Sequence, residues 1–167
     1  MARVAAQTGR ELVWMPILLG ALFRTIGTAD VPMFTMPPAK QAWVMRDLQE
    51  WAALWGVPFR FPSAFPIRSV LPLRVAIQEP GATLPIYRAA WGEDRDIASP
   101  ESLAAILDEA GFDGAALIAG ASAPAVKDAL RRNTTYAVES GVCGVPTWMA
   151  DGELYWGQDR LPLVEAL

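Results

Sequence analysis

The sequence contains no histidine and only one cysteine, and these two shortages exclude several kinds of chemistry. Without histidine there is no imidazole general base, and one cysteine cannot supply a transition-metal cluster. A single cysteine also forms neither an internal disulfide nor a Cys-x-x-Cys redox pair. We therefore expect neither dithiol oxidoreductase activity nor a metal centre.

Long apolar runs and stretches of one charge are also missing. The apolar run over residues 12–23 is broken by Pro16 and ends before Arg24, whereas a membrane span needs roughly 20 apolar residues. The first ten residues lack the apolar core of a signal peptide. The net charge of −4 comes from interspersed acids and bases, so no basic stripe is available for nucleic acid. We expect a cytoplasmic protein that binds neither nucleic acid nor membranes.

What the sequence does contain is typical of a packed globular protein. It has 167 residues, a hydrophobic fraction of 53% and seven tryptophans. That length is enough for one domain with a substantial core. No internal repeat or inter-domain linker is apparent, so we expect a single domain over residues 1–167.

A predicted β-hairpin lies near the C-terminus. The short runs 146–150 and 153–156 are joined by Asp151-Gly152, a sequence typical of a tight hairpin turn. Pro146 cannot donate to a sheet ladder, so it should open the first strand. After the hairpin, Asp159 is predicted to cap a final helix.

The remaining chain is predicted to be mostly helical. Ser69, Ser99 and Asp113 are expected helix caps, and glycines end most of the helices. Residues 18–38 contain several glycines and prolines and are expected to form a loop. The tail of a helix is expected over 2–9, a strand over 11–16, and further helices over 39–55, 68–78, 82–92, 99–110, 113–118 and 122–140.

Several motifs resemble one known family. Gly144-Val-Pro-Thr147, Asp151-Gly-Glu153 and Trp156-Gly-Gln-Asp-Arg160 are similar to the C-terminal signature of bacterial 2-hydroxychromene-2-carboxylate isomerases. These enzymes are relatives of the kappa-class glutathione transferases, in the thioredoxin-fold family that includes DsbA. Further similar segments occur in the family's order, at residues 14–23, 38–40, 45–48, 56–62 and 95–97.

The resemblance implies an α/β fold with a thioredoxin-like sheet. Residues 1–30 and 141–167 would form the thioredoxin-like part, and residues 38–140 an all-helical insertion. The strand expected over 11–16 would belong to this sheet. The order of strand, loop, block of helices, hairpin and helix agrees with that arrangement.

One part of the family pattern is missing from this sequence. In the family, a strand and a serine-bearing turn come first, and the serine lies beside the glutathione sulfur. Nothing in Met1–Val13 matches that segment, and no serine precedes Ser63. We expect either an N-terminally shortened product or a gap filled by another chain. The sheet is therefore expected to be incomplete at its N-terminus, and no catalytic residue is assigned.

The resemblance implies glutathione as the cofactor and names residues that would bind it. In the family, the residue before a cis-proline pairs its backbone with glutathione. In this sequence that residue is Val145, and the proline is Pro146. Gln158 and Asp159 would hold the γ-glutamyl end, and Lys40 a carboxylate. Thr28 falls near the position of an asparagine that contacts the same ligand. The alternatives are a plain helix cap for Asp159 and a solvated surface lysine for Lys40.

The remaining candidate residues are expected to be structural. Cys143 could be a nucleophile, but it has no histidine partner or basic neighbour in sequence. We therefore expect a small buried hydrophobic residue there. Trp148, Tyr155 and Trp156 are expected to form core and pocket wall.

The function implied by the resemblance is glutathione-dependent isomerisation in bacterial aromatic catabolism. Transient addition of the glutathione thiolate to a small aromatic carboxylate would let a double bond rotate. The missing serine leaves open whether this shortened chain binds glutathione well and is active. The alternatives are a kappa-like glutathione transferase or peroxidase, or a non-catalytic remnant that acts through a partner subunit. A homodimer is expected.

Overall fold

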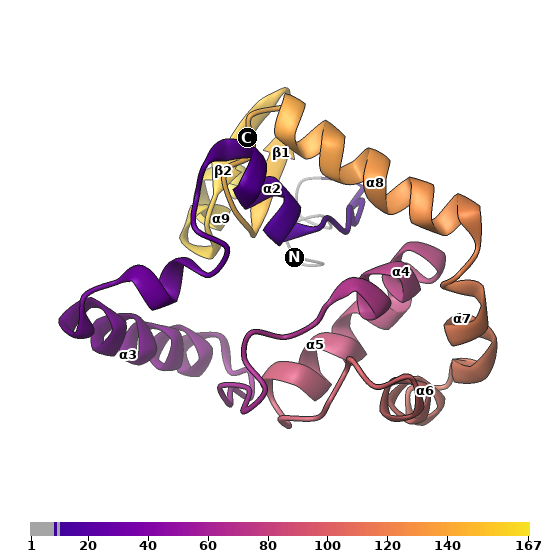
Figure 1. Cartoon of the computed structure of the whole chain (residues 1–167). Coiled ribbons are helices and arrows are strands. Elements are labelled where there is room, and N and C mark those ends of the chain that lie inside the picture. The colour runs from indigo at the N-terminus through magenta and orange to yellow at the C-terminus, as the bar shows by residue number, and fades with distance from the viewer. Residues whose placement is uncertain (1–8, 10) are drawn as a thin grey trace.

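The computed structural model describes residue 9 and residues 11–167, and it shows two groups of elements joined by a long helix. Helix α8, Pro124–Glu139, runs from one group to the other (Figure 1). At its C-terminal end lie α2 (Leu19–Ile26), β1 (Thr147–Ala150), β2 (Glu153–Trp156) and α9 (Leu161–Glu165). At its N-terminal end lie α4 (Val70–Gln78), α5 (Thr83–Trp91), α6 (Pro100–Glu109) and α7 (Gly114–Gly120).

The α4–α7 group contains the largest apolar core in the described chain. Its largest fully buried side chains are Val75, Leu103 and Leu107. The predicted caps are confirmed at two of its helices. Ser99 Oγ accepts the Ser102 N–H at 3.3 Å, and Asp113 Oδ1 accepts the Ala116 N–H at 2.9 Å. In this group, the helix caps that the sequence predicts are formed and the helices also bury a core.

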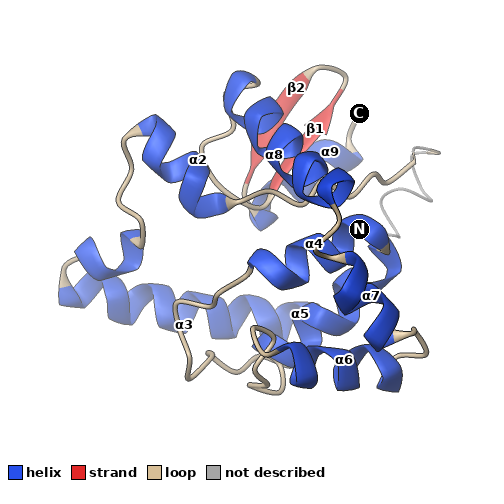
Figure 2. Cartoon of the chain, turned by 45° about the vertical axis from the view of Figure 1, so that its right-hand side comes forward, coloured by secondary structure: helices blue, strands red, loops and turns tan. Residues whose placement is uncertain are grey.

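The predicted hairpin is confirmed, including its turn. Strands β1 and β2 pair antiparallel, with Thr147 opposite Trp156 and Ala150 opposite Glu153. Asp151 and Gly152 both have positive φ angles, of 52° and 85°. This is the left-handed geometry that a two-residue hairpin turn requires and that Asp-Gly adopts readily. Figure 2 shows the hairpin at the end of the molecule opposite α5 and α6.

The expected loop over 18–38 is wrong for part of its length. Residues Leu19–Ile26 form helix α2, which ends at Gly27 with a φ of 77°. The helix forms because its apolar side chains find a partner: Leu22 is fully buried against Ala137 and Val142. Tertiary packing therefore outweighs the glycine within this helix. A short 3-10 helix, Pro32–Thr35, follows.

The strand expected over 11–16 is absent, since these residues form no ladder in the described structure. Their neighbours are side chains of α8 rather than a strand. Asn133 Nδ2 donates to the Pro16 carbonyl at 3.1 Å, and the Leu18 N–H donates to Thr134 Oγ1 at 3.0 Å. Apolar composition alone cannot make a strand without a paired edge. The helix tail expected over 2–9 falls outside the described residues except for Gly9.

Two of the predicted helix caps are also wrong. Ser69 precedes α4 but makes no capping side-chain hydrogen bond. Asp159 lies inside a 3-10 turn, Gln158–Arg160, and α9 starts only after Arg160. Residues 158–160 therefore form the 3-10 turn instead of the first turn of α9.

Helix α3, Pro38–Trp55, forms as predicted but packs poorly. Ala52 is buried, whereas Trp55 is 45% exposed. Figures 1 and 2 both show α3 extending along one side of the molecule. Within the described chain, no helix is long and apolar enough to cross a membrane.

Candidate functional site

The antiparallel hairpin brings four of the six predicted binding residues together. The Gly157 N–H donates to the Pro146 carbonyl at 2.9 Å, one position beyond the paired strands. This bond joins Val145–Pro146, which enters β1, to the turn Gln158–Arg160, which leaves β2. We call this end of the hairpin, formed by Val145, Pro146 and Gly157–Asp159, the hairpin mouth. The Val145–Pro146 peptide bond is cis, as predicted.

Val145 presents unused backbone groups at the hairpin mouth. Neither its N–H nor its C=O forms a hydrogen bond within the described chain, and the residue is 46% exposed. A backbone donor and acceptor left open at the end of a ladder can pair with a short extended peptide. Val145 is therefore suited to a one-residue extension of the sheet.

Two tryptophans of the hairpin fix the shape of the mouth. Trp148 Nε1 donates to the Gly157 carbonyl at 3.0 Å, so the exit from β2 is held on the face of β1. The Trp156 indole lies over Gly144, where a Cβ atom would be only 2.7 Å from Nε1. Glycine is therefore required at 144 for this approach. Thr147 Oγ1 closes the entry by donating to the Gly144 carbonyl at 2.6 Å.

Asp159 places a carboxylate at the hairpin mouth. Its Oδ1 occupies the space that a side chain at position 157 would need, and Gly157 has a φ of 116°. Its Oδ2 lies 3.6 Å from Arg160 Nη2, and both side chains are about half exposed. Such an exposed pair is weakly held, because water screens both charges. The carboxylate is thus available to an incoming cation.

Lys40 and Thr28 belong to other elements. Thr28 follows α2, and its N–H donates to the Phe23 carbonyl at 2.8 Å. Because Phe23 and Leu154 of β2 pack on the same buried cluster, Thr28 belongs to the same group of elements as the hairpin. Lys40 is exposed in the first turn of α3. No described hydrogen bond or ion pair connects either side chain to the hairpin mouth.

Two expectations for nearby residues need correction. Cys143 is exposed, not buried, because the turn before β1 carries it at the surface. Trp156 is 58% exposed and covers Gly144 instead of joining the core. Trp148 and Tyr155 do pack on a buried cluster, whose members are Ala150, Leu161 and Val164.

The two carboxyl groups whose pKa is shifted lie outside the hairpin. The Ser63 N–H, at 2.7 Å, lowers the pKa of Asp94, with smaller help from the Ser63 hydroxyl and Arg60. The two-pronged hydrogen bond from Arg95 lowers the pKa of Glu109. The first contact joins two connecting segments and the second joins a connecting segment to the end of α6, so both serve the fold. Among the described residues, no group of three His, Cys, Asp or Glu could hold a metal ion.

Comparison with known proteins identifies the fold. The model of the DSBA-like thioredoxin domain matches residues 1–167. The chain also resembles the solved structure of a 2-hydroxychromene-2-carboxylate isomerase, with a TM-score of 0.84 and 25% identity, over 99% of this chain and 83% of the other. The expected DsbA-like thioredoxin fold is thereby confirmed.

Similar curated proteins carry two kinds of name. A 2-hydroxychromene-2-carboxylate isomerase of Sphingobium xenophagum is 31% identical over 74% of this chain and 65% of its own length. One from Pseudomonas putida is 34% identical over 72% and 61%. Glutathione S-transferase kappa 1 of Rattus norvegicus is 26% identical over 94% and 77%. The chain thus spans less than two thirds of the length of these curated isomerases.

Proposed function

Because this chain belongs to the DSBA-like thioredoxin domain family, we propose that it binds glutathione and acts as an isomerase of the 2-hydroxychromene-2-carboxylate type. Its relatives named as such isomerases and as kappa glutathione transferases support this proposal. The substrate would be a small aromatic carboxylate, in bacterial aromatic catabolism.

The observation that carries the proposal is the open backbone of Val145 next to the carboxylate of Asp159. A tripeptide has an extended backbone that can pair with the free N–H and C=O of Val145. Glutathione also has an ammonium group in its γ-glutamyl part, which Asp159 can pair with. These residues therefore fit the cofactor that the family implies.

The other predicted residues would complete the site. Gln158 would hydrogen-bond the γ-glutamyl end from the turn beside Asp159. Lys40 would pair with a carboxylate and Thr28 would donate a hydrogen bond. Lys40 is free to do so, since no described acid pairs with it, and a lysine in the first turn of α3 does not stabilise that helix.

The residues of the hairpin mouth would bind and orient, and bound glutathione would supply the thiol nucleophile for the double-bond rotation. We assign stabilisation of the thiolate to none of the named residues. The protein's contribution is then to hold the tripeptide against the sheet edge in a fixed register.

Assembly and location form part of the same proposal. We expect a cytoplasmic homodimer, with residues 38–140 as a helical insertion in a thioredoxin-like part formed by 1–30 and 141–167. Large apolar side chains exposed on α3, among them Trp43 and Leu54, are consistent with a surface that a second copy covers. Light scattering at two protein concentrations measures this directly.

Turnover tests the enzymatic part of the proposal. The chain is incubated with 2-hydroxychromene-2-carboxylate, with and without glutathione, and the ring-opened product is followed by its absorbance. We expect isomerisation only when glutathione is present. Conjugation of glutathione to chlorodinitrobenzene without isomerisation would instead favour the kappa-type transferase. Neither activity, with glutathione still bound, would favour a non-catalytic partner subunit.

A further inference from the structure

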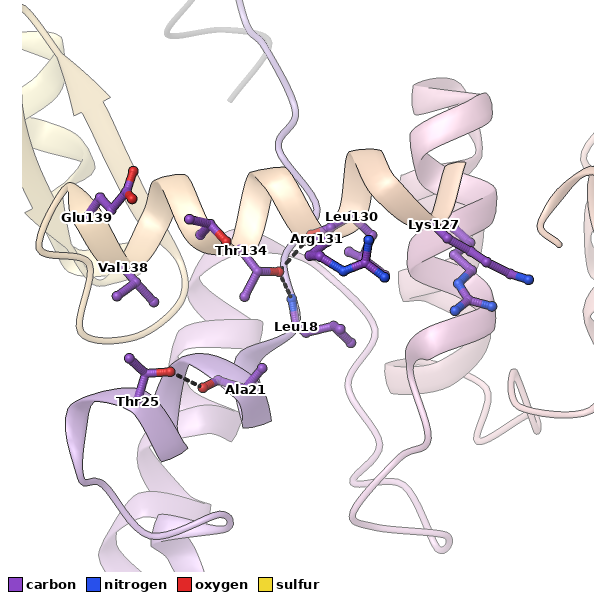
Figure 3. Close-up of a pocket in the computed structure, with 11 residues that line it drawn as sticks. Leu18, Ala21, Thr25, Lys127, Leu130, Arg131, Thr134, Val138 and Glu139 are labelled. Atoms are coloured by element: carbon purple, nitrogen blue, oxygen red, sulfur yellow. Dashed lines mark hydrogen bonds between the residues drawn. The ribbon is translucent and has the colours of Figure 1, made fainter. Parts of the chain in front are cut away.

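A cavity lies away from the hairpin mouth, between α2, α4 and α8. Its volume is about 460 Å³, which is within the range of small-molecule pockets, roughly 300–1,000 Å³. Figure 3 shows it under one face of α8, with the start of α2 as its other wall. None of the six residues assigned to glutathione lines it. It is therefore separate from the proposed glutathione site.

The α8 wall of this cavity is basic at the end near Lys127. Lys127, Arg131, Thr134 and Val138 recur at helical spacing and so share one face. Glu139, the acidic lining residue, lies near the opposite end of α8 from Lys127 (Figure 3). Twelve residues of helix separate the two, or about 18 Å. The basic end therefore keeps its positive charge.

Arg74 of α4 adds a cation to the cavity lining. Its Nε is buried and has no hydrogen-bond partner among the described residues. An unpaired buried donor is unfavourable, and no described acid forms an ion pair with Arg74. Lys127 also has no acidic partner in the described chain, whereas Arg131 pairs with Asp128. Two unpaired cations therefore line one cavity.

The start of α8 strengthens this positive potential. Lys127 follows closely after Pro124, and the first turn of α8 contains no acidic residue. A lysine so near a helix N-terminus is repelled by the helix dipole, whereas a bound anion would be attracted by both. An anion bound beside Lys127 would therefore be stabilised both by the lysine and by the N-terminus of α8.

The apolar part of the cavity is held in place by hydrogen bonds. The buried Thr134 hydroxyl donates to the Leu130 carbonyl at 2.8 Å and accepts the Leu18 N–H at 3.0 Å. These bonds fix Leu18 and Leu130 on facing walls (Figure 3). Ala21 and Val138 extend this surface. The cavity thus offers an apolar wall and a cationic end.

We infer that this cavity between α2, α4 and α8 binds an organic anion, a carboxylate on an apolar body, with Arg74 and Lys127 contacting the carboxylate. The apolar body would lie against Leu18 and Leu130. This inference does not depend on glutathione binding, because the cavity shares no residue with the hairpin mouth.

Fluorine NMR titration with fluorobenzoate tests the inference on the whole chain. We expect millimolar or tighter binding, and at least about tenfold weaker binding after R74M/K127M, because two charge-assisted contacts are lost. The matched control is R132M, which removes a neighbouring exposed cation of α8 outside the cavity. Fluorobenzamide, which has the same ring but no charge, should bind at least tenfold more weakly than fluorobenzoate.

Three results would overturn the inference: no binding of fluorobenzoate by the native chain, equal binding by the R74M/K127M variant, or equal binding of the amide. Circular dichroism checks that the double variant is folded, and K127M alone replaces it if it is not, since Lys127 is exposed. Glutathione binding, measured in parallel, should be unchanged in these variants. If the native chain did not bind glutathione, only the proposed function would be contradicted.

Discussion

The α4–α7 group and helix α3 contain similar sequence signals but differ in burial. Both have prolines at helix starts and amphipathic spacing, and both form the helices that the sequence predicts. In the α4–α7 group, Leu103 and Leu107 are fully buried. In α3, which is 18 residues long, Ala52 is the only residue that the described structure buries.

This difference shows that helix formation and burial are decided separately. Caps, prolines and spacing act within a helix, whereas burial depends on which other surface meets it. The α6 helix finds α5 and α7 as neighbours. Helix α3 leaves Leu54 75% exposed. Substitutions in the two regions should therefore have unequal effects on stability.

The largest effect is expected from removing a core leucine. Leu107→Ala should lower the free energy of unfolding by about 2–5 kcal/mol, because it leaves a cavity in a fully buried position. The matched change Leu54→Ala on α3 should cost less than about 1 kcal/mol. Urea denaturation followed by circular dichroism measures both. Equal losses would contradict the contrast drawn between the two regions.

The next largest effect is expected at the close contact of α6 with α7. A Cβ at Gly114 would overlap the backbone of Ala104, which cannot move independently. Gly114→Ala should therefore destabilise the chain by about 1–3 kcal/mol. Gly20→Ala is the control, since Gly20 lies in α2 with no atom near its Cβ position. That change should be neutral or stabilising by up to about 1 kcal/mol.

A smaller effect on stability is expected at the hairpin mouth. Gly144→Ala would place a Cβ 2.7 Å from Trp156 Nε1, so the indole must move. Because Trp156 is at the surface, we expect about 1 kcal/mol of destabilisation. The change should also alter tryptophan fluorescence and weaken glutathione binding. Unchanged fluorescence would show that the indole does not lie over Gly144.

The smallest effect concerns pH and the exposed pair Arg95–Glu109. The bond from Arg95 lowers the pKa of Glu109 from its ordinary value of 4.5. A carboxyl group with a lowered native pKa contributes stability above 4.5, and that contribution disappears as pH falls through the native pKa. Glu109→Gln should therefore be slightly less stable than the native chain at pH 7, and the difference should vanish in acid. If the difference in stability between the two chains grew in acid, the bond from Arg95 to Glu109 would not be its cause.

The sequence predicts most of the fold where the information is local. Asp151-Gly152 specifies its turn through backbone angles, and Ser99 and Asp113 cap their helices through their own side chains. The predictions fail where a partner element decides. The run 11–16 has no strand beside it, and residues 19–26 become helical because Leu22 packs against the end of α8.

The candidate site divides in the same way. The hairpin brings Val145 and Asp159 to the same end, as the Asp151-Gly152 turn and the family resemblance imply. The sequence does not predict the cavity near Arg74. Lys127 and Arg131 at i, i+4 spacing indicate a basic helix face, but nothing local shows that α4 places Arg74 on the same cavity.

Glutathione titration by calorimetry is the most direct test of the central claim, that the hairpin mouth is a tripeptide site. The native chain is compared with Asp159→Asn and with Asp30→Asn, which removes an exposed acid in the segment after α2. We predict that the native chain and Asp30→Asn bind alike, and that Asp159→Asn binds at least about tenfold more weakly, because the charged partner of the ammonium is lost. Equal binding by all three, or no binding by the native chain, would contradict the account.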